Sequence, residues 1–182
     1  TDPRNGKPYV NQLFLGHTAG AGAPFEDAWM TMLHAGNGGM CYIDSVELDE
    51  VYTPLRVHTR RLIQDSEGAG RFRGAPGIRV ELGPVDCRME AGFVADGNIH
   101  VPLGARNGGS ASRSDQFRLT VKGELERLEQ CSQVWIEDGE LLVSIACGGG
   151  GYGDPKTRDP GRVLHDVREG IISRNRAEEV YG

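Results

Sequence analysis

The sequence predicts an α+β fold that is mainly β, a short-stranded sheet domain that ends in two short C-terminal helices. Two observations lead to this prediction. Glycine contributes 27 of the 182 residues and hydrophobic residues only 38%, a composition that favours turns and short strands over a helical bundle. Short apolar runs between turn residues recur along the chain, and clear helix-capping signals follow near the C-terminus. A chain of this length can bury one core, so we expect residues 1–182 to form a single domain.

The expected strands are apolar runs separated by Gly, Pro, Asn or Asp. In chain order they cover residues 9–15, 40–46, 55–63, 78–82, 87–94, 117–121, 134–137 and 141–146. Residues 25–33 fit either a short helix or an extended segment, and residues 106–114 form a Gly/Ser-rich connection. Asp138 and Gly139 separate the last two strands, and an Asp-Gly pair between apolar runs predicts a β-hairpin.

Two short helices are expected near the C-terminus. Asp159 is an N-cap candidate, and Pro160 occupies the first helical position. Gly170 is suited to end this helix, and Ser173 is a second N-cap candidate ahead of a final helix. The apolar residues expected on the buried faces are Val163, Leu164, Val167, Ala177, Val180 and Tyr181.

The most specific feature is the glycine tract at 148–155, which directly follows the strand at 141–146 and reads Gly-Gly-Gly-Gly-Tyr-Gly-Asp-Pro. So many glycines cost conformational entropy unless close backbone packing requires them. The spacing matches the G-x-G-x-x-G fingerprint of dinucleotide sites, but Asp154-Pro155 interrupts the helix that such a site needs. No Gly-Lys-Ser/Thr closes a P-loop. We therefore interpret the tract as a structural turn packed closely against a neighbour.

Composition argues against several function classes. A net charge of −6 disfavours nucleic-acid binding. No apolar stretch approaches the length of a membrane span, and no signal segment is visible. The four cysteines form no C-x-x-C pair, which excludes a zinc ribbon and indicates free thiols in a cytoplasmic protein. The five histidines have no metal-site spacing, so we expect no metal site.

Three blocks of sequence resemble the hydantoinase B/oxoprolinase family. The glycine tract is followed, in the order typical of the family, by the pieces Arg158-Asp159-Pro160, Asp166-Val167, Ile172-Ser173 and Tyr181-Gly182. Residues 65–74, Asp-Ser-Glu-Gly-Ala-Gly-Arg-Phe-Arg-Gly, are similar to a second family motif, and residues 20–23 with Asp27 to a third, weaker one. Ala75 and Ala146-Cys147 depart from the pattern, which more often has Gly and Thr-Pro there.

Family members are several hundred residues long, so the chain, which begins at Thr1, resembles the C-terminal third of a B-type subunit. The resemblance implies part of an ATP-dependent hydrolase of cyclic amides such as hydantoins or 5-oxoproline. It also implies ATP and Mg²⁺ on a hydantoinase A-like partner subunit, a divalent metal on the N-terminal portion of the B-type subunit, and none of these on this chain alone. The expected partners are that N-terminal portion, the A-like subunit and a small-molecule substrate, without nucleic acid or membrane.

Candidate catalytic residues are weakly marked. His17 lies on a loop beside glycines, where an imidazole could act as a general base, although a surface histidine without function is the commoner case. Glu47 and Asp49 are two positions apart and would share one face of an extended segment. They could form an acid–base pair or, more often, serve as exposed charges on a strand edge.

Arg71 and Arg73 lie between glycines and could bind a carboxylate or phosphate, or form ion pairs with acidic residues. Together with the glycine tract they form the candidate substrate or interface set, which comprises Arg71, Arg73, Gly148, Gly149, Gly150, Gly151, Tyr152, Gly153, Asp154 and Arg158.

Two alternatives to the cyclic-amide hydrolase remain open at this point. The family resemblance also includes subunits of ATP-dependent acetone and acetophenone carboxylases, and no residue of the chain separates lactam from ketone substrates. The chain is also compatible with a non-catalytic assembly module, because it shows neither a catalytic triad nor metal spacing.

Overall fold

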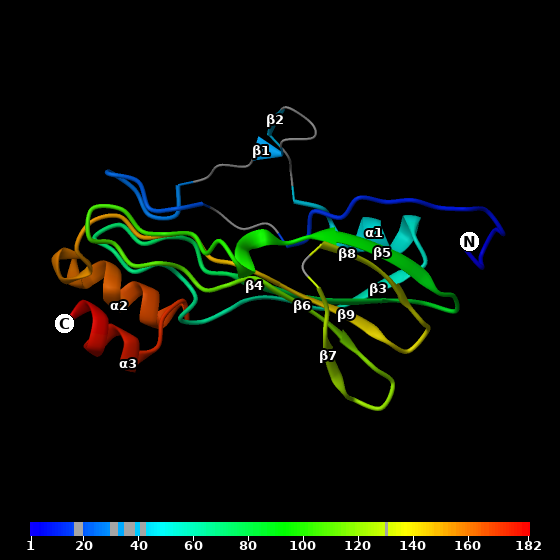
Figure 1. The fold of residues 1–182 in the computed structure, drawn as a ribbon. Helices are drawn as coiled ribbons and strands as arrows, with labels where there is room; N and C mark the ends of the chain where they lie inside the picture. The colour runs from blue at the N-terminus through cyan, green and yellow to red at the C-terminus, as the bar shows by residue number, and fades with distance from the viewer. Residues whose placement is uncertain (17–19, 30–32, 35–38, 41–42, 130) are drawn as a thin grey trace.

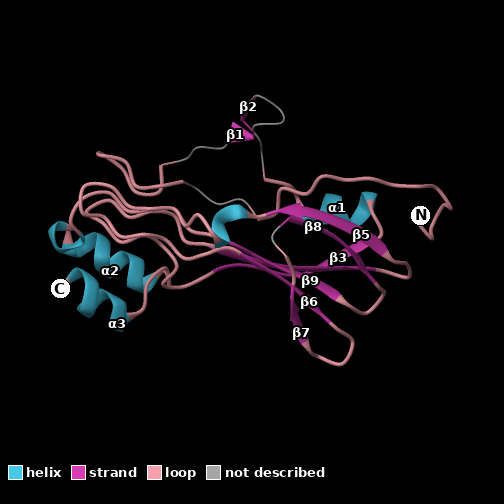
Figure 2. Cartoon of the chain, viewed as in Figure 1, coloured by secondary structure: helices cyan, strands magenta, loops and turns pink. Residues whose placement is uncertain are grey.

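The computed structural model describes residues 1–182 except 17–19, 30–32, 35–38, 41–42 and 130. Two sheets and a short helix occupy one end of the molecule, and the C-terminal helices occupy the other (Figures 1 and 2). Several extended segments run side by side between the two ends (Figure 1). The predicted class, an α+β fold dominated by short strands with terminal helices, is confirmed.

The larger sheet has five strands in the order β3-β4-β9-β6-β7, and each neighbouring pair is antiparallel. Its strands are β3 (Leu55–Leu62), β4 (Ile78–Pro84), β6 (Asp115–Leu119), β7 (Leu125–Arg127) and β9 (Leu141–Ala146). The central strand β9 pairs Ile145 with both Arg79 of β4 and Asp115 of β6. The glycine tract therefore leaves the middle of this sheet.

A second sheet contains only β5 (Met89–Val94) and β8 (Cys131–Ile136), and a small pair joins β1 (Leu33–His34) to β2 (Gly39–Met40). Burial alternates along β5 and β8, as expected for strands with one packed face. The main hydrophobic core lies where these strands meet the larger sheet and the segment around Leu15. Its buried members are Leu15, Ile78, Val80, Leu82, Ile136 and Leu142.

Six of the predicted strands are confirmed within a few residues. The predictions for 55–63, 78–82, 87–94, 117–121, 134–137 and 141–146 correspond to β3, β4, β5, β6, β8 and β9. Residues 106–114 form the predicted connection, with only a bridge at Ala105 beside it. These segments contain dense β-branched or aromatic runs between turn residues, so local sequence was sufficient to place them.

Three local predictions are wrong. Residues 9–15 belong to no sheet, and Leu15 lies in a turn. In the predicted strand 40–46, Met40 ends β2 and Val46 begins helix α1 (Val46–Tyr52), with residues 41–42 outside the described part. For residues 25–33 we expected a short helix or an extended segment. The described residues 25–29 form bends and a turn instead, Ala28 has a positive φ of 47°, and Leu33 begins β1. A segment becomes a strand only when its backbone hydrogen-bonds to a neighbouring strand. The apolar periodicity of the sequence does not show whether such a neighbour is present.

The turn at Asp138-Gly139 is present, but the predicted hairpin is wrong. Gly139 has a φ of +84°, and the Glu140 N–H donates to the Glu137 carbonyl at 3.0 Å. The flanking strands then separate, because β8 pairs with β5 while β9 inserts between β4 and β6. The turn residues specify the reversal of the chain, whereas long-range packing decides the partners of each strand.

The two C-terminal helices form as predicted, except that Leu164, which we expected on the buried face, is 50% exposed. α2 covers Pro160–Arg168, and the Asp159 side chain caps it by accepting from the Arg162 N–H at 3.0 Å. Gly170 follows with a φ of +70°. Ser173 caps α3 (Arg174–Arg176), which continues as a π-helical turn over Ala177–Tyr181. Short 3-10 turns occur at Asp96–Asn98 and Pro155–Thr157, and no helix in the described ranges has the length and apolar character to cross a bilayer.

Candidate functional site

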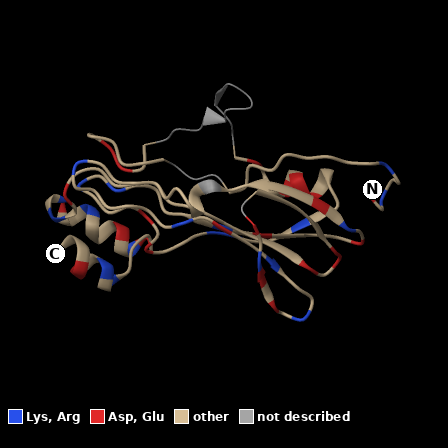
Figure 3. Ribbon diagram, in the orientation of Figure 1, with Lys and Arg blue, Asp and Glu red and all other residues tan. Residues whose placement is uncertain are grey.

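The glycine tract lies inside a bundle of extended backbone segments from this same chain. We call this the glycine bundle and define it as residues 20–22, 66–75, 103–109 and 148–153. The segments bond to one another in several directions: Gly68 N–H donates to the Gly149 carbonyl at 2.8 Å, and Gly151 N–H donates to the Gly109 carbonyl at 2.9 Å. Gly22 N–H donates to the Gly150 carbonyl at 2.8 Å. The charged residues gather at the two ends of the molecule, and the bundle between them carries few (Figure 3).

The bundle requires glycine because its backbones approach too closely for side chains. A Cβ placed on Gly148, Gly150 or Gly151 would lie less than 3.0 Å from a backbone carbonyl of a neighbouring segment. A Cβ on Gly74 would meet the backbone of Gly149 in the same way. Only a residue without a side chain fits at such an approach. This packing explains why the 65–74 motif and the 148–155 tract occur in one sequence.

The hydrogen bonds of the bundle also argue against nucleotide binding at the tract. A phosphate cradle needs free backbone N–H groups that point at the ligand. Here the N–H groups of Gly149, Tyr152 and Gly153 donate to the carbonyls of Ala75, Phe72 and Ala105 at 2.8–3.0 Å. Helix α2 begins only at Pro160, too far along the chain to present its N-terminus at the tract. The tract is therefore a structural element of this chain.

A network of buried ion pairs joins the bundle to helix α2. Arg158 donates to Asp27 at 2.7 and 2.9 Å and to Asp166 at 2.7 Å. Arg73 donates from Nε to the other oxygen of Asp166 at 3.0 Å. The side chains of Arg158 and Asp166 are each 1% exposed, so these charges are balanced by one another rather than by water. Arg162 adds an exposed contact to Asp27 at 3.1 Å.

These contacts divide the predicted arginines into two groups. The guanidinium groups of Arg73 and Arg158 form ion pairs with carboxylates of this chain. For Arg73, this corresponds to the alternative in which the arginine pairs with acidic residues of the chain. The side chain of Arg71 is exposed, and its guanidinium lies 5.6 Å from the Phe72 ring, with that of Arg162 at 5.8 Å. A role of Arg71 and of the glycine tract in contacting substrate or a partner stays a prediction.

A second buried cluster attaches the C-terminal helices to the 65–74 motif. The side chain of Glu67 is 0% exposed and accepts from Arg176 at 2.8 Å and from the Tyr181 hydroxyl at 3.1 Å. Burial, followed by the charge of Glu67, raises the pKa of Tyr181, so its hydroxyl stays a proton donor. The sequence analysis placed Glu67 and Tyr181 in family motifs but did not pair them, and it did not single out Arg176. The signal that could have found Glu67 is its position between Ser66 and Gly68-Ala69-Gly70, where small residues predict close packing around an acidic side chain.

The structure corrects the placement of Glu47 and Asp49. Both lie on helix α1 rather than on an extended edge, because Ser45 caps the helix and its hydroxyl donates to Glu47 at 2.7 Å. Positions two apart point away from each other on a helix, so the two carboxylates do not share a face. This hydrogen bond lowers the pKa of Glu47, whereas burial and then the charge of Asp44 raise the pKa of Asp49.

The candidate residues do not converge on one place. Helix α1, with Glu47 and Asp49, lies at the sheet end of the molecule, far from α2 and the arginine network (Figure 1). His17 lies outside the described residues. Among the described ranges, no group of three or more His, Cys, Asp or Glu side chains is arranged to hold a metal ion. In the part of the chain that the structure describes, the candidate residues therefore form a framework, and Glu47 and Asp49 do not form an acid–base pair.

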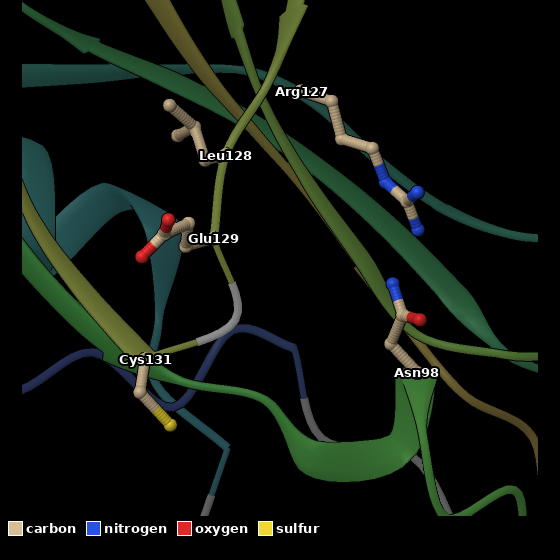
Figure 4. Close-up of a pocket in the computed structure, with 5 residues that line it drawn as sticks. All are labelled: Asn98, Arg127, Leu128, Glu129 and Cys131. Atoms are coloured by element: carbon tan, nitrogen blue, oxygen red, sulfur yellow. The ribbon is translucent and has the colours of Figure 1, made fainter.

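One open pocket of about 610 Å³ lies beside β7 and β8 and is lined by Asn98, Arg127, Leu128, Glu129 and Cys131 (Figure 4). The guanidinium of Arg127 is already paired with Asp115 at 2.9 Å. Asn98 also donates to Asp115, at 3.3 Å. The polar groups on this side of the pocket are therefore committed to one another.

The chain belongs to the hydantoinase B/oxoprolinase family, whose sequence model matches residues 1–155. The resemblance stated from its motifs is thereby confirmed. The beta subunit of caprolactamase from Pseudomonas jessenii is 34% identical over 187 residues, which cover 100% of this chain and 32% of the relative. A putative B-type subunit of a D-/L-hydantoinase from Pseudomonas sp. (strain NS671) is 30% identical over 145 residues, which cover 75% of this chain and 23% of the relative.

The fold has a counterpart among solved structures. The crystal structure of the ATP-dependent caprolactamase from Pseudomonas jessenii matches 100% of this chain with a TM-score of 0.77 and 29% sequence identity. The match covers 32% of that chain. The present chain thus spans about a third or less of the length of these relatives.

We expect a side chain at the centre of the glycine bundle to destabilise the fold. In Gly151→Ala the new methyl group would meet the backbone of Gly68 and Ala69, and such overpacking costs about 1–3 kcal/mol or more. Urea unfolding followed by circular dichroism measures the change in the free energy of unfolding. Gly92→Ala is the matched control, because its Cβ would have no heavy atom within 4 Å. Equal stability of the two variants would contradict the packing argument.

Removal of the shared carboxylate should destabilise the arginine network. In Asp166→Asn, two buried guanidinium groups lose their common counter-charge, and breaking a buried pair in this way costs about 3–5 kcal/mol. The free energy of unfolding measured in urea tests this. The control is Glu126→Gln, which breaks the Arg118 pair whose partners are 34% and 45% exposed, and we expect it to cost less than about 1 kcal/mol. A loss no larger than that of the control would contradict the role of Asp166.

Stability should fall in acid through Asp27. Burial acts to raise the pKa of Asp27, but the hydrogen bonds and charge of Arg158 outweigh it, and the net pKa lies below the ordinary value of 3.8. A carboxyl group with a lowered folded-state pKa stabilises the fold above its unfolded pKa and loses this effect as pH falls through the folded pKa. Urea titrations between pH 6 and pH 2 (about the range involved) should show a smaller acid-induced loss for Asp27→Asn than for the unchanged chain. Identical pH profiles would exclude this contribution.

Proposed function

We propose that the chain is the C-terminal third of a B-type subunit in an ATP-dependent hydrolase of cyclic amides. The observation that carries the proposal is the match of the whole chain to the ATP-dependent caprolactamase, with a TM-score of 0.77 and 29% identity. The relative that is named as part of a hydantoinase supports the same substrate class. Caprolactam and hydantoin are both rings that contain an amide bond, and hydrolysis opens each ring at that bond.

The chemistry explains why ATP would be needed. Resonance makes an amide carbonyl a poor electrophile, and transfer of a phosphoryl group to its oxygen creates a better one. ATP supplies this activation when it is bound. The N–H groups of Gly149, Gly151, Tyr152 and Gly153 donate to carbonyls within the chain, so these groups are not available to hold phosphates. We therefore assign ATP and Mg²⁺ to an A-type partner subunit, and a divalent metal to the N-terminal portion of the B-type subunit.

The contribution of this chain, in this proposal, is a rigid framework. The glycine bundle and the Arg73–Asp166–Arg158 network connect the central strand β9 to helices α2 and α3. Among the arginines of the candidate set, Arg71 is exposed while Arg73 and Arg158 are buried, and Arg71 is our candidate for contact with an anionic group of the substrate or partner. We propose that residues 1–182 form one domain of the larger subunit, located in the cytoplasm, where the free thiols of Cys87 and Cys131 would stay reduced.

Reconstitution tests the proposed function. The chain is combined with the remainder of a B-type subunit and an A-type subunit, and ADP release is measured with caprolactam, hydantoin, 5-oxoproline or acetone plus bicarbonate. We expect ADP release that depends on one of the cyclic amides, only in the complete mixture, and none from the isolated chain.

The other outcomes are equally informative. ADP release that depends on acetone and bicarbonate would replace the hydrolase proposal with a carboxylase. Turnover by the isolated chain would contradict the division of work between subunits. A complete, folded mixture that hydrolyses ATP with no substrate dependence would leave the chain as an assembly module.

A further inference from the structure

A groove of about 880 Å³ opens over the main hydrophobic core, at the sheet end of the molecule. Two runs of consecutive residues, 9–16 and 88–94, line it. Residues of the larger sheet also line it, among them Leu55 of β3, Leu82 of β4 and Leu142 of β9. The same leucines at positions 82 and 142 belong to the core cluster. The groove is thus an opening into the core.

The run 88–94 shows that the groove follows the edge of strand β5. Successive side chains of a strand point to opposite faces, so a groove on one face would be lined by every second residue. All residues from Arg88 to Val94 line this groove. The sheet order gives β5 a single partner, β8, among the described strands. The other edge of β5 therefore presents backbone N–H and C=O groups to the groove, and such an edge is a template for another strand.

Gly92 supplies an independent reason to expect a backbone at this edge. Glycine weakens the interior of a strand and often marks a place where another backbone approaches closely. In the glycine bundle, the neighbours that require glycine belong to this chain. Gly92 has no positive φ and no heavy atom within 4 Å of its Cβ position. Nothing that the structure describes thus requires glycine here, which fits an approach of this site by a backbone from outside the chain.

The side chains around the edge are suited to burial. Val10 is 99% exposed and Val94 is 82% exposed, and both line the groove. The inward residues Met89, Ala91 and Phe93 pack against the core but are only partly buried. Residues 9–15 have the apolar run of a strand without belonging to a sheet. These features fit a sheet that lacks one member.

We propose that the free edge of β5 binds an extended strand from the part of a B-type subunit that this chain does not span. The proposal rests on the proposed function for the identity of the partner. The caprolactamase beta subunit matches all of this chain with only 32% of its length, so most of that polypeptide lies outside the match and is the source that we assign to the strand. The seven residues 88–94 offer an edge about 23 Å long at ~3.3 Å per residue, enough for one ordinary strand.

The test uses the full 182-residue chain and, as probe, the portion of the Pseudomonas jessenii caprolactamase beta subunit outside its match to this chain. Isothermal titration calorimetry measures binding, and hydrogen exchange reports protection of the β5 amides. We expect a complex in which the β5 amides that face away from β8 become protected. Gly92→Lys should weaken binding by at least about tenfold, because lysine on a strand edge opposes pairing.

Val121→Lys is the matched control, because Val121 is 69% exposed and lies outside the groove, and it should bind like the unchanged chain. Gly92→Lys places its side chain in open space, so the isolated variant should keep the circular dichroism of the parent. No complex, or a complex without protection of β5, would overturn the proposal. Self-association of the chain through β5 would also overturn it, by assigning the edge to a second copy. Binding needs no turnover, so these outcomes are separate from a failure of the ATP-dependent activity.

Discussion

Close contact between bare backbones is the constraint on which this structure depends. In most domains, side chains fill the space between elements, but in the glycine bundle the main chains of residues 66–75, 103–109 and 148–153 take their place. Hydrogen bonds then run between several neighbours at once, so every segment must be present for each to be satisfied. This mutual dependence makes the bundle a rigid connection between the central sheet and the C-terminal helices.

The ion pairs give this connection a defined end. The glycine bundle has few side chains that could interlock. Backbone hydrogen bonds alone would therefore allow its segments to shift relative to one another. Arg73, Arg158 and Asp166 connect the 65–74 motif, the residues after the tract and helix α2 at fixed positions. Glu67 does the same for the last helical turn through Arg176 and Tyr181. We infer that these buried pairs contribute more to a unique arrangement of the segments than to net stability.

The two ends of the molecule consequently have different characters. At the helix end, the buried charges of Arg73, Arg158 and Asp166 pair within the chain, and the segments of the glycine bundle bond to one another. At the sheet end, β5 has one partner among the described strands, and the groove reaches core residues such as Leu82 and Leu142. For a chain that spans about a third of its caprolactamase relative, this asymmetry is physically reasonable. The completed end organises the chain, and the incomplete end offers the surface on which the rest of a subunit would pack.

The sequence by itself determined the family, because long motifs carry the resemblance. It also determined six of the strands, the caps of both terminal helices and the need for close packing at the tract, because these depend on local chemistry. The tertiary structure alone decided which strands pair across Asp138-Gly139, that Glu47 and Asp49 lie on a helix, and that Arg73 and Arg158 share Asp166. Those outcomes depend on contacts between residues far apart in the chain, such as positions 73 and 166. Local periodicity carries no information about such contacts.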